Sequence, residues 1–180
     1  LQDLMSRLLQ SNRAMQPSTL SVHEILERVR RLIAAEYPEI KLVRDYDTSL
    51  PDITGDREQL IQAVLNIARN AAQAMQGRGE IQLRTRAVRQ VTLAKKHYRL
   101  ALELQVVDNG PGIPMELKEQ IFYPLVSGRE GGSGLGLTIA QGVVQKKQGK
   151  IEVDSRPGRT CFTLMWPYSN GKALAKKKKK

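Results

Sequence analysis

Two long stretches of the chain carry hydrophobic residues at the spacing of an α-helix. The first is striped along one face by six aliphatic side chains: Val22, Ile25, Leu26, Val29, Leu32 and Ile33. Ser21 and Glu24 form a capping-box pattern at its start, which predicts a helix that ends near Tyr37 and Pro38. A second helix is expected from about Asp56 to Met75, with the glycines at 77 and 79 ending it.

The second predicted helix also carries a stripe of amides beside its apolar face. Asn66, Asn70 and Gln73 fall within about 60° of one another when each residue turns the helix by about 100°. A solvated helix surface explains a lone asparagine as well as a functional site does. The amide stripe therefore indicates a functional site only in combination with other motifs.

Strict alternation of apolar and polar residues predicts the strands. A first strand covers 40–46, two long strands around 81–85 and 100–106 form an antiparallel hairpin, and two more cover 150–154 and 160–166. The turn Arg156-Pro157-Gly158 separates the last two strands. Five strands and three main helices in this order predict an α+β two-layer sandwich.

Composition indicates one domain with short appendages. The 180 residues are 41% hydrophobic and 26% charged, and a single cysteine, Cys161, permits no internal disulfide. We expect a remnant helix and linker over 1–18, one domain over 19–168 and a basic, disordered tail over 169–180. No stretch reaches the roughly 18 apolar residues of a membrane span, and no signal peptide opens the chain, so a cytoplasmic protein is expected.

The net charge of +11 does not indicate a nucleic-acid-binding protein. Six lysines of the tail, Lys172 and those at 176–180, contribute more than half of this charge. Only eight aromatic residues are present, and none is interleaved with basic residues as a base-stacking surface requires. The lysine tail is interpreted as a solvated segment.

Two glycine-rich segments carry candidate chemistry. The segment Gly132-Ser133-Gly134-Leu135-Gly136-Leu137 opens a helix, where unpaired backbone N–H groups hold anions such as phosphate, although a flexible loop is the alternative. It fits neither a Walker motif nor the dinucleotide-binding spacing. Asp108-Asn109-Gly110-Pro111-Gly112 places a carboxylate at a strand end, where it either accepts an adenine amino proton or forms an Asx turn.

The motifs together resemble a known family. Five short motifs occur in order: Asn66/Asn70, Asp108 with Gly110 and Gly112, Phe122/Pro124, Gly132 with Gly134 and Gly136, and Gly158/Thr160. They are similar to the N, G1, F, G2 and G3 boxes of sensor histidine kinases, over about residues 20–167. The segments at 44–51 and 122–137 look most similar to the kinases of nitrogen regulation. The resemblance implies the GHKL (Bergerat) fold, with a mixed, mostly antiparallel five-stranded sheet covered by three helices.

The resemblance also implies a site for ATP and Mg²⁺. Asn70 is expected to bind Mg²⁺, Asp108 to read the adenine amino group and Thr160 to support the base, which Gly110 and Gly112 border. The lid spans about 122–136, and Arg129 stands where many relatives aim a lysine at the γ-phosphate. The remaining expected nucleotide-binding residues are Arg69, Gln73, Gly132, Gly134, Leu135, Gly136, Leu137 and Lys150.

Two of these positions depart from the family pattern. Gln73 stands where relatives have a lysine, so Arg69 is the candidate replacement charge, although it points to another helix face. Lys150 replaces a frequent glycine and is a candidate for reaching the nucleotide, with a plain surface lysine as the alternative.

Asn66 separates a kinase from a hydrolase in this superfamily. Chaperones and repair ATPases carry a glutamate at this position to activate water, and an amide cannot act as a general base at neutral pH. Asn66, Asn70 and Arg129 are therefore the catalytic candidates of a kinase. Neither His23 nor His97 fits the acceptor motif, and both are interpreted as ordinary surface histidines.

The expected function is transfer of the ATP γ-phosphoryl group to a histidine on a dimerisation domain outside this chain. The resemblance implies a homodimeric full-length protein, the PII signal protein as an effector that docks on or near the lid, and a response regulator of the NtrC type as the later acceptor. The alternative is a nucleotide-gated binding module without productive catalysis.

Overall fold

The computed structural model describes residues 18–114 and 133–168. The predicted remnant helix, most of the lid and the lysine tail lie outside these residues. Helix α2 (Val22–Glu36) begins after Ser21, whose Oγ accepts a hydrogen bond from the His23 N–H at 3.2 Å. Helix α3 (Arg57–Ala74) begins after Asp56, whose Oδ1 accepts from the N–H groups of Glu58 and Gln59. Both helices end within a residue or two of the predicted positions.

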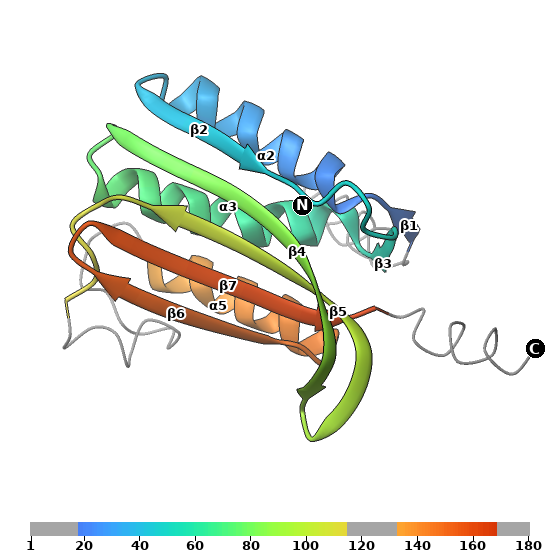
Figure 1. The fold of residues 1–180 in the computed structure, drawn as a ribbon. Coiled ribbons are helices and arrows are strands. Elements are labelled where there is room, and N and C mark those ends of the chain that lie inside the picture. The colour runs from blue at the N-terminus through green and yellow to red at the C-terminus, as the bar shows by residue number, and fades with distance from the viewer. Residues whose placement is uncertain (1–17, 115–132, 169–180) are drawn as a thin grey trace, which may run out of the picture.

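A five-stranded sheet forms the second layer (Figure 1). Its strands are β2 (Ile40–Asp45), β4 (Gly79–Leu93), β5 (Lys96–Asp108), β6 (Lys150–Arg156) and β7 (Arg159–Pro167), in the order β2-β4-β5-β7-β6. Strand β2 pairs with β4 in parallel, and all the other pairs are antiparallel. The predicted mixed, mostly antiparallel five-stranded sheet is confirmed.

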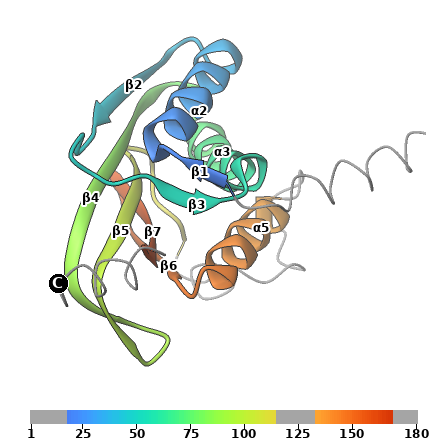
Figure 2. The ribbon, with the colours of Figure 1, turned by 90° about the vertical axis from the view of Figure 1, so that its right-hand side faces the viewer.

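The helices α2, α3 and α5 (Ser133–Lys146) cover one face of this sheet, as Figure 2 shows. The core lies between the two layers. Leu26 and Ile67 from the helices and Leu83, Leu102 and Leu104 from the sheet are at most 1% exposed. The α+β two-layer sandwich expected from the sequence is thus present, with three helices in the described parts of the chain.

Three features differ from the sequence-based expectations. Strands β1 (Ser18–Leu20) and β3 (Ile53–Gly55) form a small antiparallel sheet that no pattern predicted, and Ser18 belongs to it rather than to a linker. The β4–β5 hairpin is much longer than expected, and His97 lies on β5 beside its tip. Helix α5 begins at Ser133, which places Gly134 and Gly136 in its first turn instead of in the lid.

Candidate functional site

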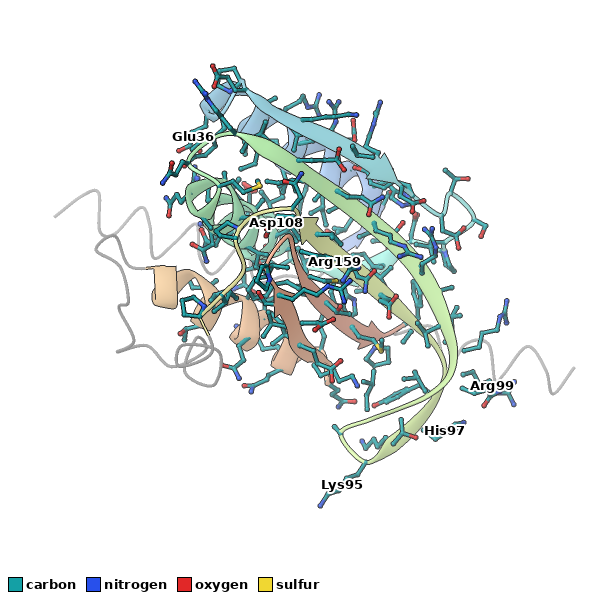
Figure 3. All side chains as sticks on the ribbon, turned by 60° about the vertical axis from the view of Figure 1, so that its left-hand side comes forward. Glu36, Lys95, His97, Arg99, Asp108 and Arg159 are labelled. Atoms are coloured by element: carbon teal, nitrogen blue, oxygen red, sulfur yellow. The ribbon has the colours of Figure 1, made fainter. Side chains whose placement is uncertain are left out.

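The motifs of the chain meet at one end of the sheet, beside the C-terminal end of α3. Asp108 is the last residue of β5 and pairs with Thr160 of β7. The loop 110–114 follows β5 and lies against the turn between β6 and β7, because the Gly158 N–H donates to the Gly110 carbonyl at 2.8 Å. Figure 3 shows Asp108 inside this part of the fold. The expected base-binding residues are therefore neighbours in space.

Asp108 is a buried carboxylate, only 5% exposed. Its Oδ1 accepts a hydrogen bond from the Gly110 N–H at 2.8 Å, and Oδ2 has no hydrogen-bond partner in the described part of the chain. Burial raises the pKa of this carboxyl group, and the Gly110 hydrogen bond opposes the rise. The structure thus keeps one acceptor atom of a buried carboxylate available.

Two glycines allow the backbone to pass close to its neighbours here. A Cβ on Gly110 would lie 2.8 Å from Cγ of Met75 and 3.0 Å from Oδ1 of Asp108. Gly112 has a φ of +90°, and a Cβ there would lie 2.8 Å from the Arg156 carbonyl oxygen. The positions that the sequence singled out as glycines bordering a ligand are thus also sterically required.

Ser155 is a central residue of the site that the sequence analysis missed. Its Oγ accepts from the Ile113 N–H at 2.7 Å and lies 2.7 Å from Oγ1 of Thr160. Both Ser155 and Thr160 are buried polar residues, so these contacts fix the loop after β5 to the β6–β7 turn. A serine at an inward position of β6, after Ile151 and Val153, was the available signal.

A cavity of about 840 Å³ opens over this frame. Its described lining comes from α3 and the residues after it, from the loop after β5 and from the β6–β7 turn: Gln73, Ala74, Gln76, Pro111, Gly112, Ile113, Pro114, Ser155, Arg156 and Pro157. Asp108 is not itself among these lining residues, but its hydrogen bond to the Gly110 N–H holds the residue that directly precedes Pro111 of the lining. The size is within the range of small-molecule pockets.

The amide stripe of α3 is only partly at the cavity. Gln73 lines it, and Asn70, one turn earlier on α3, is half-buried. Asn66 accepts a hydrogen bond from the Gln62 side-chain amide at 3.0 Å. Arg69, the candidate replacement charge, instead pairs with Glu36 of α2 across 2.9 Å, so the structure directs it away from the cavity.

The remaining predicted residues fall into two groups. Lys150 begins β6, whereas the cavity lies at Ser155 and Arg156, roughly 17–20 Å further along an extended strand. It pairs with Glu152 at 3.5 Å, which favours the surface-lysine interpretation. Gly134, Leu135 and Gly136 lie in the first turn of α5, and Leu137 is buried. Arg129 and Gly132 lie outside the described residues.

Neither described histidine has the position of a phosphoryl acceptor. His23 is not an ordinary surface residue: its ring stacks on Tyr46 at 4.6 Å, and Nε2 lies 2.9 Å from Oγ1 of Thr85. Burial lowers the pKa of His23, while Asp47 and Glu27 act in the opposite direction. His97 is exposed and lies 2.7 Å from Oε1 of Gln90.

No group of three or more His, Cys, Asp or Glu side chains in the described ranges could hold a metal ion. The amide oxygens of the α3 stripe are hard ligands of the kind that Mg²⁺ accepts. Among the helices that the structure describes, none is long and apolar enough to cross a membrane.

The comparison with known families supports this interpretation of the site. Residues 55–170 match the family model described as histidine kinase-, DNA gyrase B- and HSP90-like ATPase. The chain is 50% identical over 169 residues to the sensory histidine kinase/phosphatase NtrB of Klebsiella oxytoca, covering 93% of this chain and 48% of that protein. It is 40% identical to NtrB of Rhodobacter capsulatus, in a match that covers 83% of this chain and 43% of that protein. The chain spans about half the length of these curated relatives.

Solved structures agree. The catalytic domain of histidine kinase ThkA superposes with a TM-score of 0.73 at 25% identity, covering 86% of this chain and 97% of that one. The mycobacterial sensor histidine kinase MprB gives a TM-score of 0.67 at 26% identity, with the same coverage.

Proposed function

Since the chain belongs to the family of histidine kinase-, DNA gyrase B- and HSP90-like ATPases, we propose that it is the ATP-binding catalytic domain of a sensor histidine kinase of the NtrB type. In this proposal, residues 19–168 bind ATP and present its γ-phosphoryl group to a histidine on a dimerisation domain outside this chain. The likeness to NtrB favours this function over a binding module without catalysis.

The observation that carries the proposal is the buried carboxylate of Asp108. The adenine amino group donates a hydrogen bond to Oδ2, while Oδ1 stays bound to the Gly110 N–H. Guanine has a carbonyl at the equivalent position and would meet a buried negative charge, which is unfavourable. Thr160, fixed by Ser155, supports the same end of the base.

We propose Asn70 as the protein ligand of Mg²⁺. Its amide oxygen is a neutral, hard ligand, and the phosphates and water supply the other positions. Bound Mg²⁺ neutralises charge that builds up on the phosphates during transfer. The N–H groups at the start of α5, including those of Gly134 and Leu135, precede the first i→i−4 hydrogen bond of the helix and can hold phosphate oxygens.

Asn66 directs the reaction toward transfer rather than hydrolysis. Its amide, bound to Gln62, has no basic atom to take a proton from water. The γ-phosphoryl group is therefore kept for a better nucleophile, the imidazole of the acceptor histidine. His23 is packed against Tyr46 and Thr85, and His97 lies near the tip of the β4–β5 hairpin, away from the cavity. We therefore propose that the acceptor is a histidine on the dimerisation domain.

The likeness to NtrB extends the proposal to partners. A homodimeric full-length kinase would pass the phosphoryl group to a response regulator of the NtrC type, and the PII signal protein would control the kinase by binding at or near the predicted lid. The lid lies outside the described residues, so this docking site is a proposal from the sequence.

A phosphotransfer assay tests the proposed function. The chain is mixed with Mg²⁺, γ-labelled ATP and a purified NtrB-type dimerisation domain, and label on histidine is followed with time. We expect transfer by the parent, loss in Asn70→Ala, and parental transfer in Glu58→Gln, which changes an exposed residue in the first turn of the same helix, away from Asn66 and Asn70. If the parent binds ATP but transfers no label to histidine, the proposal of kinase activity is wrong and a binding module is favoured.

A further inference from the structure

The β4–β5 hairpin extends well beyond the sheet. Strand β4 pairs with β2 only as far as Arg84, and β5 pairs with β7 only from Ala101 onward. Residues 87–100, here called the projecting hairpin, therefore form a ribbon of two strands. Within the described structure its outer edges are unpaired except at Leu100, whose carbonyl accepts a hydrogen bond from the Tyr168 N–H at 3.2 Å. Figure 1 shows this ribbon leaving the body of the domain.

The projecting hairpin has its own means of keeping a fixed shape. Val88, Val91 and Tyr98 pack on a small cluster formed by Leu93, Ala101 and Met165, separate from the main core. The Tyr98 hydroxyl donates to Oε1 of Gln148 at 2.5 Å, which ties the ribbon to the segment after α5. Two-stranded ribbons alone are marginally stable, so these contacts are what hold the hairpin as a rigid surface.

The turn at the tip is strained. Ala94 and Lys95 have φ values of +51° and +66°, a region that favours glycine or asparagine. Such strain persists where the surroundings impose it and is frequent at functional positions. It holds Lys95 and Lys96 at the outer end of the ribbon, and Figure 3 shows Lys95 and Arg99 there.

All charge on the projecting hairpin has one sign. Arg89, Lys95, Lys96 and Arg99 are exposed, and none belongs to an ion pair in the described structure. The sequence has no acidic residue between Glu80 and Glu103. By contrast, Arg86 at the base of the ribbon pairs with Asp45 at 2.8 Å. The ribbon therefore presents an uncompensated positive field away from the nucleotide cavity.

Lysines on a free strand also prevent edge-to-edge aggregation, and this role is compatible with the binding of a partner by the same charges. A single-stranded nucleic acid would need exposed aromatic rings for stacking, and the one aromatic residue besides His97, Tyr98, is packed in the cluster. We propose that the projecting hairpin is a docking surface for an acidic, Asp- and Glu-rich segment of a partner protein.

The test uses the whole chain without nucleotide, so its outcome does not depend on the proposed kinase activity. Binding of a fluorescent Asp/Glu-rich peptide is measured by anisotropy at low and high salt. The hairpin variant combines Arg89→Gln, Lys95→Gln, Lys96→Gln and Arg99→Gln. The control variant removes the same charge elsewhere, by Arg28→Gln, Arg31→Gln, Lys41→Gln and Arg57→Gln, and circular dichroism and melting confirm that both are folded.

We expect the hairpin variant to bind the peptide about tenfold more weakly, and the control variant to keep most of the parental affinity. Amide NMR shifts on adding the peptide should concentrate in residues 87–100. Equal losses in both variants would overturn the proposal, because they show attraction to net charge alone. Tighter binding of a single-stranded DNA of equal charge than of the peptide would also overturn it. So would a loss of peptide affinity in the control variant alone, since the arginines changed there line a groove between α2 and α3.

Discussion

The buried carboxylate of Asp108, proposed to bind adenine, lowers the stability of the folded state when it is charged. Because burial raises its pKa, the folded chain holds this proton more tightly than the unfolded chain, and the folded state loses stability as pH rises through the raised pKa. Asp108→Asn removes this charge and can still accept the Gly110 hydrogen bond. We expect the variant to be at least as stable as the parent in urea unfolding, with an advantage that grows as pH rises above about 4, the ordinary pKa of an aspartate. Lower stability than the parent at pH 8 would contradict the account.

Two glycines should respond to alanine in opposite ways. Gly112→Ala adds a Cβ 2.8 Å from a backbone oxygen at a φ of +90°, and we expect a loss of about 1–3 kcal/mol in the free energy of unfolding. Gly142 of α5 has nothing within 4 Å of the added Cβ, so Gly142→Ala should gain about 0.5–1 kcal/mol. Urea denaturation measures both, and a neutral Gly112→Ala would show that the loop is free to move.

For single residues, the spacing of the motifs predicted those whose contacts lie close by in the sequence. Asp108, Gly110, Gly112 and Thr160 were found from the motifs, and the structure brings them together. Ser155 was missed because its importance comes from Ile113 and Thr160, contacts that exist only after β6 and β7 pair. For Lys150 the sequence left two alternatives open, a nucleotide contact or a surface lysine, because position in the sequence does not show which end of a strand lies near the cavity.

Between elements, His23 joins α2 to β2 and β4 through Tyr46 and Thr85. Its pKa is lowered by burial, so the stability it contributes is complete above the ordinary pKa of about 6.5 and is lost as pH falls through the lowered value. We expect His23→Gln to flatten the fall in stability between pH 7 and pH 5. His97→Gln, at an exposed position, is the control and should keep the parental slope, and equal slopes for all three proteins would rule out His23 as the source.

Element prediction succeeded where a buried stripe was long. Helices α2 and α3 have such stripes, whereas β1 and β3 are three residues each, too short for any periodicity. The hairpin was predicted short because exposed Ala87, Arg89 and Gln90 interrupt its alternation. Its outer part is held by the separate cluster around Leu93 and by Tyr98 with Gln148, which no local pattern shows.

For the whole molecule, the order of the motifs was more informative than any single motif. Segments from α3, the end of β5 and the β6–β7 turn are far apart in the chain and line one cavity. The solved catalytic domain of histidine kinase ThkA has the same fold, with a TM-score of 0.73. The two layers of the fold could therefore be predicted, while the projecting hairpin became apparent only from the structure.

The central claim is that Asp108 reads the adenine of ATP, and calorimetric titration of the chain with Mg-ATP and Mg-GTP tests it most directly. The parent should bind ATP in preference to GTP. Asp108→Asn should lower ATP affinity about tenfold or more and reduce this preference, because a hydrogen bond to a charged acceptor is worth about 1.5–3 kcal/mol. Asp154→Asn, an exposed aspartate on β6, should bind as the parent does. An Asp108→Asn variant with parental affinity and parental preference for ATP would contradict the account.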